Sequence, residues 1–210
     1  MEYQSDRHHR RSIRLKGYDY SAAGAYFVTV CSQNRECLFG DVVDGKMRLN
    51  DVGHMVYKAW NDLSVKYSDI ETDEFVVMPN HVHGIIVIVG AGPCACPGIH
   101  ARPESCTAQP QTGQPQGVAP TTLSLPEIVH RFKSFTTAEY RNGVRLQHWP
   151  PFNSKLWQRN YYEHIIRSEE EMNRIREYTI ENPIKWADDE DNPDTIIHRR
   201  GMPCHAPQTR

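Results

Sequence analysis

Runs of hydrophobic residues along the chain predict four β-strands. Residues 26–33 (YFVTVCSQ) are rich in the β-branched and aromatic side chains that strands favour. Residues 70–79 and 81–90 predict two more strands that meet at a Pro-Asn pair, and this short connection favours an antiparallel pair. Residues 156–166 are again aromatic and β-branched, and they predict the last strand.

Hydrophobic residues at helical spacing predict three helices between and after these strands. Residues 49–67 repeat them every three or four positions, and residues 123–141 do so after a Ser-x-Pro-Glu start signal. A third helix begins at Ser168 and ends near Asn182, because a residue before proline is disfavoured in the α region. The order β-α-β-β-α-β predicts an α+β, ferredoxin-like fold, with an antiparallel sheet, two helices on one face and an appended C-terminal helix.

One segment interrupts this pattern and divides the chain. Residues 91–120 consist mainly of Pro, Gly, Gln, Ser and Thr, which bury too little apolar surface to offset the entropy of ordering, so we expect a disordered insertion. We expect a basic N-terminal arm at residues 1–20, one domain at 21–186 and an acidic, then low-complexity tail at 187–210. The insertion holds Cys94, Cys96, Cys106 and His100, whose spacing does not match paired zinc ligands, and we expect them to be unliganded.

The distribution of charge changes what the net charge of −2 implies. Five acidic residues fall within residues 188–194, so the remainder of the chain is net positive. Basic residues gather in the N-terminal arm, where Arg10, Arg11, Arg14 and Lys16 are candidates for phosphate contacts. The longest apolar run, GIIVIVGAG, is too short to span a membrane, and the N-terminus has no secretory signal, so we expect a cytoplasmic, nucleoid-associated protein.

The segment MPNHVHGIIVIV, residues 78–89, places two histidines one residue apart in a predicted strand. Successive strand side chains point to opposite faces, so His81 and His83 share one face, while Val82 and residues 85–89 supply a buried one. Two neighbouring imidazoles form half of a metal site. On the last predicted helix, Tyr178 and Asn182 are four residues apart and share a face, so they offer a nucleophile and a third ligand.

Each of these features also has a purely structural explanation. The chain has 11 histidines, and a His-x-His pair on a strand arises by chance more often than not. Tyr178 fits an ordinary helix tyrosine, and Asn182 fits a helix terminator. Tyr161 and Tyr162 compete as nucleophiles, but they lie on a predicted strand without a ligand-like partner one turn away. The joint occurrence of His-x-His and Tyr-x-x-x-Asn, in this order, favours a metal and nucleophile site over these structural explanations.

Together these motifs resemble the single-tyrosine HUH transposases of the insertion-sequence-200-like superfamily, and among them the REP-associated tyrosine transposases. The likeness is carried by RRSIRLKGYDY (10–20), YFVTV (26–30), MPNHVHGI (78–85), LWQRNYYEHIIR (156–167) and REYTIENPIKW (176–186). It implies the ferredoxin-like fold and a metal-dependent endonuclease and strand transferase. Such an enzyme cuts single-stranded DNA beside palindromic, REP-like hairpins through a 5′-phosphotyrosine, here at Tyr178.

The resemblance also implies a cofactor and a DNA-binding surface. Mg²⁺ or Mn²⁺ would be held by His81, His83 and Asn182, although insertion-sequence members typically have Gln in place of this Asn. Besides the basic arm, we expect DNA contacts from Arg131, Lys133, Arg159, Tyr161, Tyr162, His164 and Arg167. Relatives include monomers and homodimers. Two alternatives stay open, a hairpin-DNA-binding protein without turnover and a metal-dependent phosphoesterase that uses water.

Overall fold

A four-stranded antiparallel sheet forms the centre of the computed structural model, which describes residues 15, 17–89, 123–189, 191–193 and 195. Its strands are β1 (Gly24–Cys31), β4 (Ile70–Val77), β5 (His81–Ile88) and β6 (Tyr162–Ile166). They lie in the order β4-β5-β1-β6, and every neighbouring pair is antiparallel. This is the strand order of a ferredoxin-like sheet, so the predicted fold class is confirmed.

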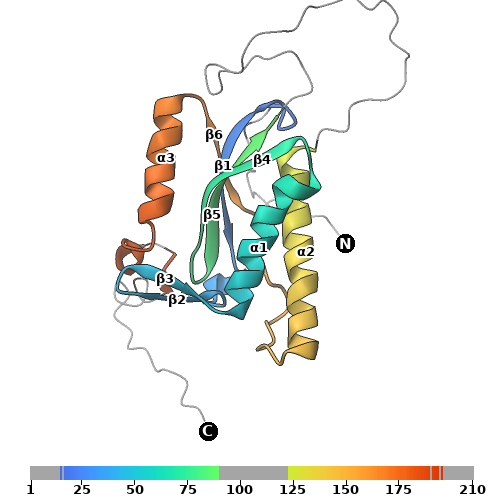
Figure 1. The fold of residues 1–210 in the computed structure, drawn as a ribbon, viewed down its shortest axis with the longest axis vertical. Coiled ribbons are helices and arrows are strands. Elements are labelled where there is room, and N and C mark those ends of the chain that lie inside the picture. The colour runs from blue at the N-terminus through green and yellow to red at the C-terminus, as the bar shows by residue number, and fades with distance from the viewer. Residues whose placement is uncertain (1–14, 16, 90–122, 190, 194, 196–210) are drawn as a thin grey trace, which may run out of the picture.

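The helices lie on both sides of this sheet (Figure 1). Helices α1 (Asp51–Lys66) and α2 (Leu125–Leu146) cover one face, and α3 (Glu169–Glu181) covers the other. Two short 3₁₀ helices, η2 (Gln33–Arg35) and η3 (Trp186–Asp188), complete the described helical elements. Among the described helices, none is both long and apolar enough to cross a membrane.

The strands divide their side chains between two hydrophobic clusters of unequal size. On β1 and β5, alternate residues such as Tyr26, Val28 and Ile86 enter the large core beneath α1 and α2. Phe27 and Ile85 point the other way and pack with Met172 of α3. The prediction that residues 85–89 form one buried face was therefore wrong, because both faces of β5 are covered by helices.

Gly84 shows why a small residue follows the second histidine. A Cβ built at this position would lie 2.3 Å from Cζ2 of Trp60 on α1 and 2.9 Å from Cβ of Phe75 on β4. The Trp60 and Phe75 rings are stacked, with centroids 5.7 Å apart. Because Gly84 has no side chain, Trp60 can lie directly on β5 and seat α1 against the sheet.

A hairpin of β2 (Gly40–Val43) and β3 (Lys46–Leu49) was missed by the sequence analysis. Its strands have four residues each and bury little, so their hydrophobic pattern is weak. The turn does carry a signal, because Asp44 and Gly45 adopt positive φ angles of 53° and 70°. An Asp-Gly pair is typical of such two-residue hairpin turns.

Several predicted boundaries also differ from the structure. The first strand begins and ends two residues earlier than predicted, and α2 continues past residue 141 to Leu146. The last strand covers only residues 162–166, because Leu156 and Trp157 are buried in the core and interrupt the alternation. The indole of Trp157 donates to the Thr136 hydroxyl of α2 at 2.8 Å, which fixes this irregular segment.

The prediction that Asn182 leaves the α region before Pro183 was wrong. Helix α3 ends at Glu181, yet Asn182 has a φ of −54° and a ψ of −42°. The chain continues in tight turns, in which the Lys185 N–H donates to the Asn182 carbonyl at 3.1 Å. These turns lead into η3, and the Asn182 side chain is buried at the C-terminal end of α3.

Other predictions lie outside the described residues. These are residues 1–14 and 16 of the basic arm, with Arg10, Arg11, Arg14 and Lys16, the insertion with its cysteines and His100, and most of the C-terminal tail. The proposed division into arm, domain and tail stays a prediction.

Candidate metal and nucleophile site

His81 and His83 lie next to each other on the face of β5 that α3 covers. On the neighbouring strand β1, His81 pairs with Cys31 and His83 pairs with Thr29. The two imidazole rings are 4.3 Å apart between centroids, and their exposed fractions are 0% and 4%. The alternation of a strand thus places both rings side by side, as the His-x-His spacing predicted.

Asn80 determines which nitrogen of His81 carries the proton. Its amide nitrogen donates to the carbonyls of Arg35 and Asp191, at 3.1 and 2.6 Å, so its Oδ1 must face the other way. That oxygen lies 2.8 Å from His81 Nδ1 and accepts its hydrogen. A neutral His81 consequently presents the lone pair of Nε2.

His83 is held in a comparable way by Thr29 and Phe27. Its Nδ1 is 2.8 Å from the Thr29 hydroxyl, and its ring stacks on Phe27 with centroids 5.4 Å apart. Because the hydroxyl engages Nδ1, Nε2 is the nitrogen left to bind a ligand. Partners of this kind orient metal-binding histidines in proteins.

Both histidines are neutral at physiological pH. Burial lowers the pKa of His83 to about 3. The pKa of His81 is also held well below 6.5, chiefly by burial and further by His83 and Arg35, against a smaller opposite effect of Asn182. Neutral imidazole is the form that binds metal ions.

Two buried polar atoms indicate that a cation fits here. Among the described residues, neither Nε2 of His81 nor Oδ1 of Asn182 has a hydrogen-bond partner, although both atoms are buried. An unpaired buried polar group costs free energy, so such a group in a native structure favours an ion or a water molecule as its partner. Both atoms carry lone pairs and no hydrogen, as metal ligands require.

Asp189, after η3, adds a carboxylate that the sequence analysis did not predict. The ligand atoms of His81, His83 and Asp189 all lie within 4.8 Å of one another. One Asp189 oxygen also accepts the backbone N–H of Asp191 at 2.7 Å, which fixes its orientation. With Asn182, the donor set comprises two imidazoles, an amide oxygen and a carboxylate, a combination that suits Mn²⁺ or Mg²⁺.

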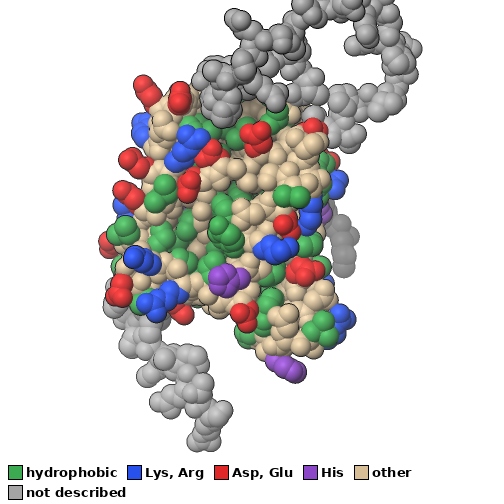
Figure 2. All heavy atoms as spheres, viewed as in Figure 1, with side chains coloured by type: hydrophobic (Ala, Val, Ile, Leu, Met, Phe, Trp, Pro, Cys, Tyr) green, Lys and Arg blue, Asp and Glu red, His purple; other side chains and the backbone are tan. Residues whose placement is uncertain are grey.

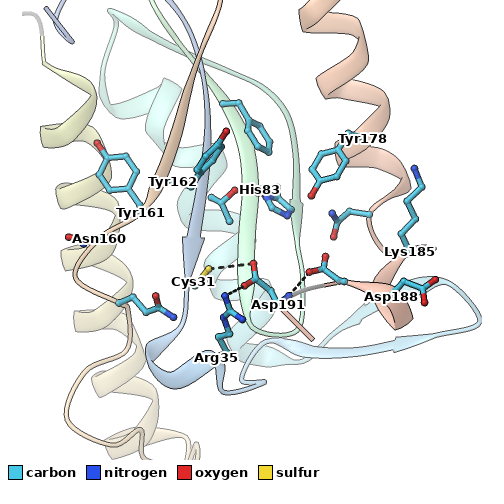
Figure 3. Close-up of a pocket in the computed structure, with 15 residues that line it drawn as sticks. Cys31, Arg35, His83, Asn160, Tyr161, Tyr162, Tyr178, Lys185, Asp188 and Asp191 are labelled. Atoms are coloured by element: carbon cyan, nitrogen blue, oxygen red, sulfur yellow. Dashed lines mark hydrogen bonds and ion pairs between the residues drawn. The ribbon is translucent and has the colours of Figure 1, made fainter. Parts of the chain in front are cut away.

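Tyr178 extends from α3 toward His83 (Figure 3). The centroid of its ring lies 5.4 Å from that of His83 and 6.0 Å from that of Phe27. Its side chain is 42% exposed, whereas Asn182, one helical turn later, is 1% exposed. The structure thus brings together the two histidines, the tyrosine and the asparagine, while leaving the tyrosine accessible to solvent.

A cleft of about 1040 Å³ opens onto this site. Tyr178, His83 and Asn182 line it, together with Tyr161 and Tyr162 from the other side. Tyr162 on β6 is 52% exposed and touches Phe27 edge-on. Tyr161 precedes the strand, so its predicted place on a strand was wrong. Both tyrosines line the cleft, and their contacts with DNA stay a prediction.

Lys133 and Arg131 of α2 point in different directions. The Lys133 ammonium donates to the carbonyls of Gln158 and Asn160 at 3.0 and 3.1 Å and lies over the Tyr161 ring. It therefore ties the segment before β6 to α2. Arg131 lies over the ring of Tyr67 in a separate hollow between α1 and α2. DNA contacts of both residues stay a prediction.

The remaining predicted DNA contacts surround β6. His164 Nε2 is 2.7 Å from a Glu171 oxygen, and the other oxygen of that carboxylate accepts the Arg167 backbone N–H at 2.7 Å. The side chains of Arg159 and Arg167 are exposed. His164 thus fastens the start of α3, and its contact with DNA, like those of the two arginines, stays a prediction.

No role was predicted for Asn80 or Asp189 from the sequence, and only one of these two residues could have been found there. Asn80 directly precedes His81, so its proximity was available from the motif. Asp189 lies in an acidic run that resembles a solvated tail, and no local pattern places it beside a strand 106 positions earlier in the chain.

No family model matches the chain. Similar solved structures include a REP-associated tyrosine transposase bound to a REP hairpin, with 18% identity, a TM-score of 0.44 and coverage of 82% of this chain and 73% of that one. Another is a candidate transposase from Deinococcus radiodurans, with 17% identity, a TM-score of 0.40 and coverage of 81% and 96%.

Sequence similarity to a protein of Haemophilus influenzae is much stronger. This relative, an uncharacterized protein, is 42% identical over 194 residues, which cover 90% of this chain and 96% of the relative. Nearly the whole of both chains is therefore related. At this identity and coverage, the chain belongs to the same protein family as the Haemophilus influenzae protein.

Proposed function

We propose that the protein is a metal-dependent endonuclease and strand transferase for single-stranded DNA, which cuts beside hairpins with Tyr178 as nucleophile. One observation carries this proposal. The exposed Tyr178 ring lies against His83, and the nearby residues His81 and Asn182 each carry a buried polar atom without a hydrogen-bond partner in the part of the chain that the structure describes. A phenol beside a set of candidate metal ligands suits phosphoryl transfer to tyrosine.

His81, His83, Asn182 and Asp189 are the residues that would hold the divalent cation. When bound, a cation at such a site polarises a phosphate oxygen and neutralises negative charge that builds up during displacement. The chain itself supplies the tautomer of His81 through Asn80 and the orientation of His83 through Thr29.

The proposed reaction is a transesterification, in which one phosphorus–oxygen bond forms and another breaks. The Tyr178 hydroxyl loses its proton and its oxygen attacks the phosphorus, while the bond from phosphorus to the 3′ oxygen breaks. The 3′ oxygen takes up a proton and leaves as a 3′-OH, and the downstream strand stays attached through a 5′-phosphotyrosine. One phosphodiester replaces another, so a second 3′-OH can reverse the step and join a new strand without ATP.

The cleft suits single-stranded rather than double-stranded DNA. Tyr161 and Tyr162 present aromatic surface opposite Tyr178, and such rings stack on unpaired bases. The preference for a hairpin flank rests on the sequence motifs shared with REP-associated transposases. A REP-like hairpin with single-stranded flanks is therefore the substrate for a test.

Labelled hairpins test the nucleophile and the direction of cleavage. With Mn²⁺, a hairpin labelled at its 3′ end should become covalently bound to the protein, whereas a 5′ label should be released on a fragment ending in 3′-OH. Tyr178→Phe should bind the hairpin but form no adduct, because it keeps the ring and loses the oxygen. Tyr162→Phe is the matched control and should form the adduct.

The same substrates distinguish the alternatives. A phosphoesterase that uses water would cut the hairpin without linking either label to the protein, and Tyr178→Phe would still cut. A silent DNA-binding protein would do neither in any divalent metal. Mass mapping of the adduct to Tyr161 or Tyr162 would also contradict the assignment to Tyr178.

A further inference from the structure

Helix α3 carries the proposed nucleophile but is only lightly packed on the sheet. In the described structure its buried residues are Met172 and Thr179. Met172, with the partly buried Ile175, contacts the small cluster of Phe27 and Ile85. Acidic and basic side chains lie side by side on its outer surface (Figure 2). Met172 and Ile175 thus pack the first half of α3 on the sheet, whereas the second half contributes only buried Thr179 and the half-exposed ring of Tyr178 to this packing.

A bidentate ion pair joins this second half to the edge of the sheet. Arg176 donates from Nε to one Asp73 oxygen at 2.7 Å and from Nη2 to the other at 2.6 Å. The two side chains are 33% and 26% exposed, so solvent screens the pair only in part. A guanidinium and a carboxylate paired in this way have a fixed mutual orientation as well as a favourable energy.

An irregularity in β4 places Asp73 where Arg176 can reach it. Thr72 pairs with Ile86 and Phe75 pairs with Gly84, so two residues of β4 face the single residue Ile85 of β5. This bulge lets Phe75 point toward Trp60 in the main core while Asp73 points toward α3. A regular strand would place residues 73 and 75 on the same face.

We propose that Asp73 and Arg176 form a positioning pair that sets the rotation of α3 and thereby the place of Tyr178 relative to His83. Arg176 is two residues before Tyr178, which is about 200° around a helix at about 100° per residue. With Arg176 fixed on β4, on one side of the helix, Tyr178 is directed to the other side. The proposal rests on the proposed role of Tyr178 as nucleophile.

The pair complements a separate anchor at the start of α3. Glu171 accepts from the Arg167 backbone N–H and lies 2.7 Å from His164, and Ser168 caps the first turn. That anchor fixes where the helix begins. It does not hold the second half, so a change at Asp73 or Arg176 is expected to misdirect Tyr178 without unfolding the helix.

Three variants and a matched control test the pair. Asp73→Asn and Arg176→Gln should each slow adduct formation at saturating hairpin by about 10- to 100-fold, as misplacement of a reacting group does, with the hairpin dissociation constant changed less than about threefold. The double variant should be no slower than either single variant, because the two act as one unit. Arg174→Gln removes an exposed cation from the same helix and should stay within about twofold of the parent.

A measurement without DNA or metal separates this proposal from the function of Tyr178. Ring-to-ring nuclear Overhauser effects between Tyr178 and Phe27 should be present in the parent and in Arg174→Gln, and weakened in Asp73→Asn and Arg176→Gln. Suppose that the parent forms no adduct while the Overhauser effects are still weakened in Asp73→Asn and Arg176→Gln. In that case the proposed function fails and the positioning role stands. If Arg176→Gln lowers the midpoint of urea unfolding, Arg176→Lys replaces it, because lysine keeps the positive charge but cannot form the bidentate contact with Asp73.

Other outcomes would overturn the positioning role. One is an unchanged Tyr178 to Phe27 contact in both single variants. Another is multiplicative loss of rate in the double variant, which would show that Asp73 and Arg176 act separately. A third is loss of hairpin affinity in proportion to rate, which would assign the pair to DNA binding.

Discussion

One amide side chain, that of Asn80, determines the chemistry of His81. Asn80→Ala removes the acceptor for Nδ1–H and leaves the carbonyls of Arg35 and Asp191 without their donor. We expect Mn²⁺ affinity to fall by about 10- to 100-fold, as it does when partners that orient metal ligands are removed. Titration followed by electron paramagnetic resonance measures this affinity directly.

Asn61→Ala provides the control for this change. Asn61 is exposed on α1 and donates to the Tyr57 carbonyl, so its loss should leave Mn²⁺ affinity unchanged. Equal affinities for Asn80→Ala and Asn61→Ala would show that Asn80 does not set the tautomer.

Lys133 is a second residue whose role depends on its partners. Because its ammonium donates to carbonyls of residues 158 and 160, Lys133→Met should lower the free energy of unfolding by about 1–3 kcal/mol. If the ammonium stays on these carbonyls, the salt dependence of hairpin binding should be unchanged. Urea unfolding and binding at several salt concentrations separate the two roles, with Lys58→Met on α1 as an exposed control.

At the scale of elements, the contact between α1 and β5 depends on a glycine, Gly84, at the point where Trp60 meets the strand. Gly84→Ala would place a methyl group 2.3 Å from Trp60, so the helix or the strand must move. Overpacking of this kind costs roughly 1–3 kcal/mol. Urea unfolding of Gly84→Ala should show this loss.

Gly24→Ala on β1 is the matched control for Gly84→Ala. Its added Cβ would meet Tyr26 atoms at 3.6 Å or more, an ordinary contact, so its stability should change little. Equal stability of both variants would mean that Trp60 yields to the methyl group without cost.

At the scale of the whole molecule, the buried histidines couple folding to pH. Unfolded histidines take up protons below pH 6.5, whereas folded His83 does so only near its pKa of about 3. The unfolded state therefore binds more protons in this window, and the free energy of unfolding falls as pH falls from about 6.5 toward 3. The limiting slope is about 1.4 kcal/mol per pH unit for each histidine.

Unfolding in urea with a chelator, at pH 7, 6 and 5, tests this coupling. His83→Gln should flatten the pH dependence, because it removes one of the groups that titrate differently in the two states. His54→Gln, at an exposed position on α1, should leave it unchanged. A pH dependence that survives in His83→Gln would assign the effect to other groups.

Across the whole chain, patterns local in sequence were predictable and contacts between distant segments were not. The alternation around His81 and His83 predicted β5 and the face that carries the two candidate metal ligands, and helical spacing placed Tyr178 and Asn182 on one face of α3. The β2–β3 hairpin was missed because its short strands bury little, although Asp44-Gly45 marked its turn. Asp189 was missed because its partners are set by the path of the chain after α3.

The alternation of β5 divides one strand between two tasks. Val82, Gly84 and Ile86 serve the main core, while His81 and His83 serve the site. Substitutions on one face can therefore accumulate with little effect on the other. Insertion or deletion of a single residue is different, because it would turn every following side chain to the opposite face. During evolution this strand can change its residues one at a time, but its length is fixed.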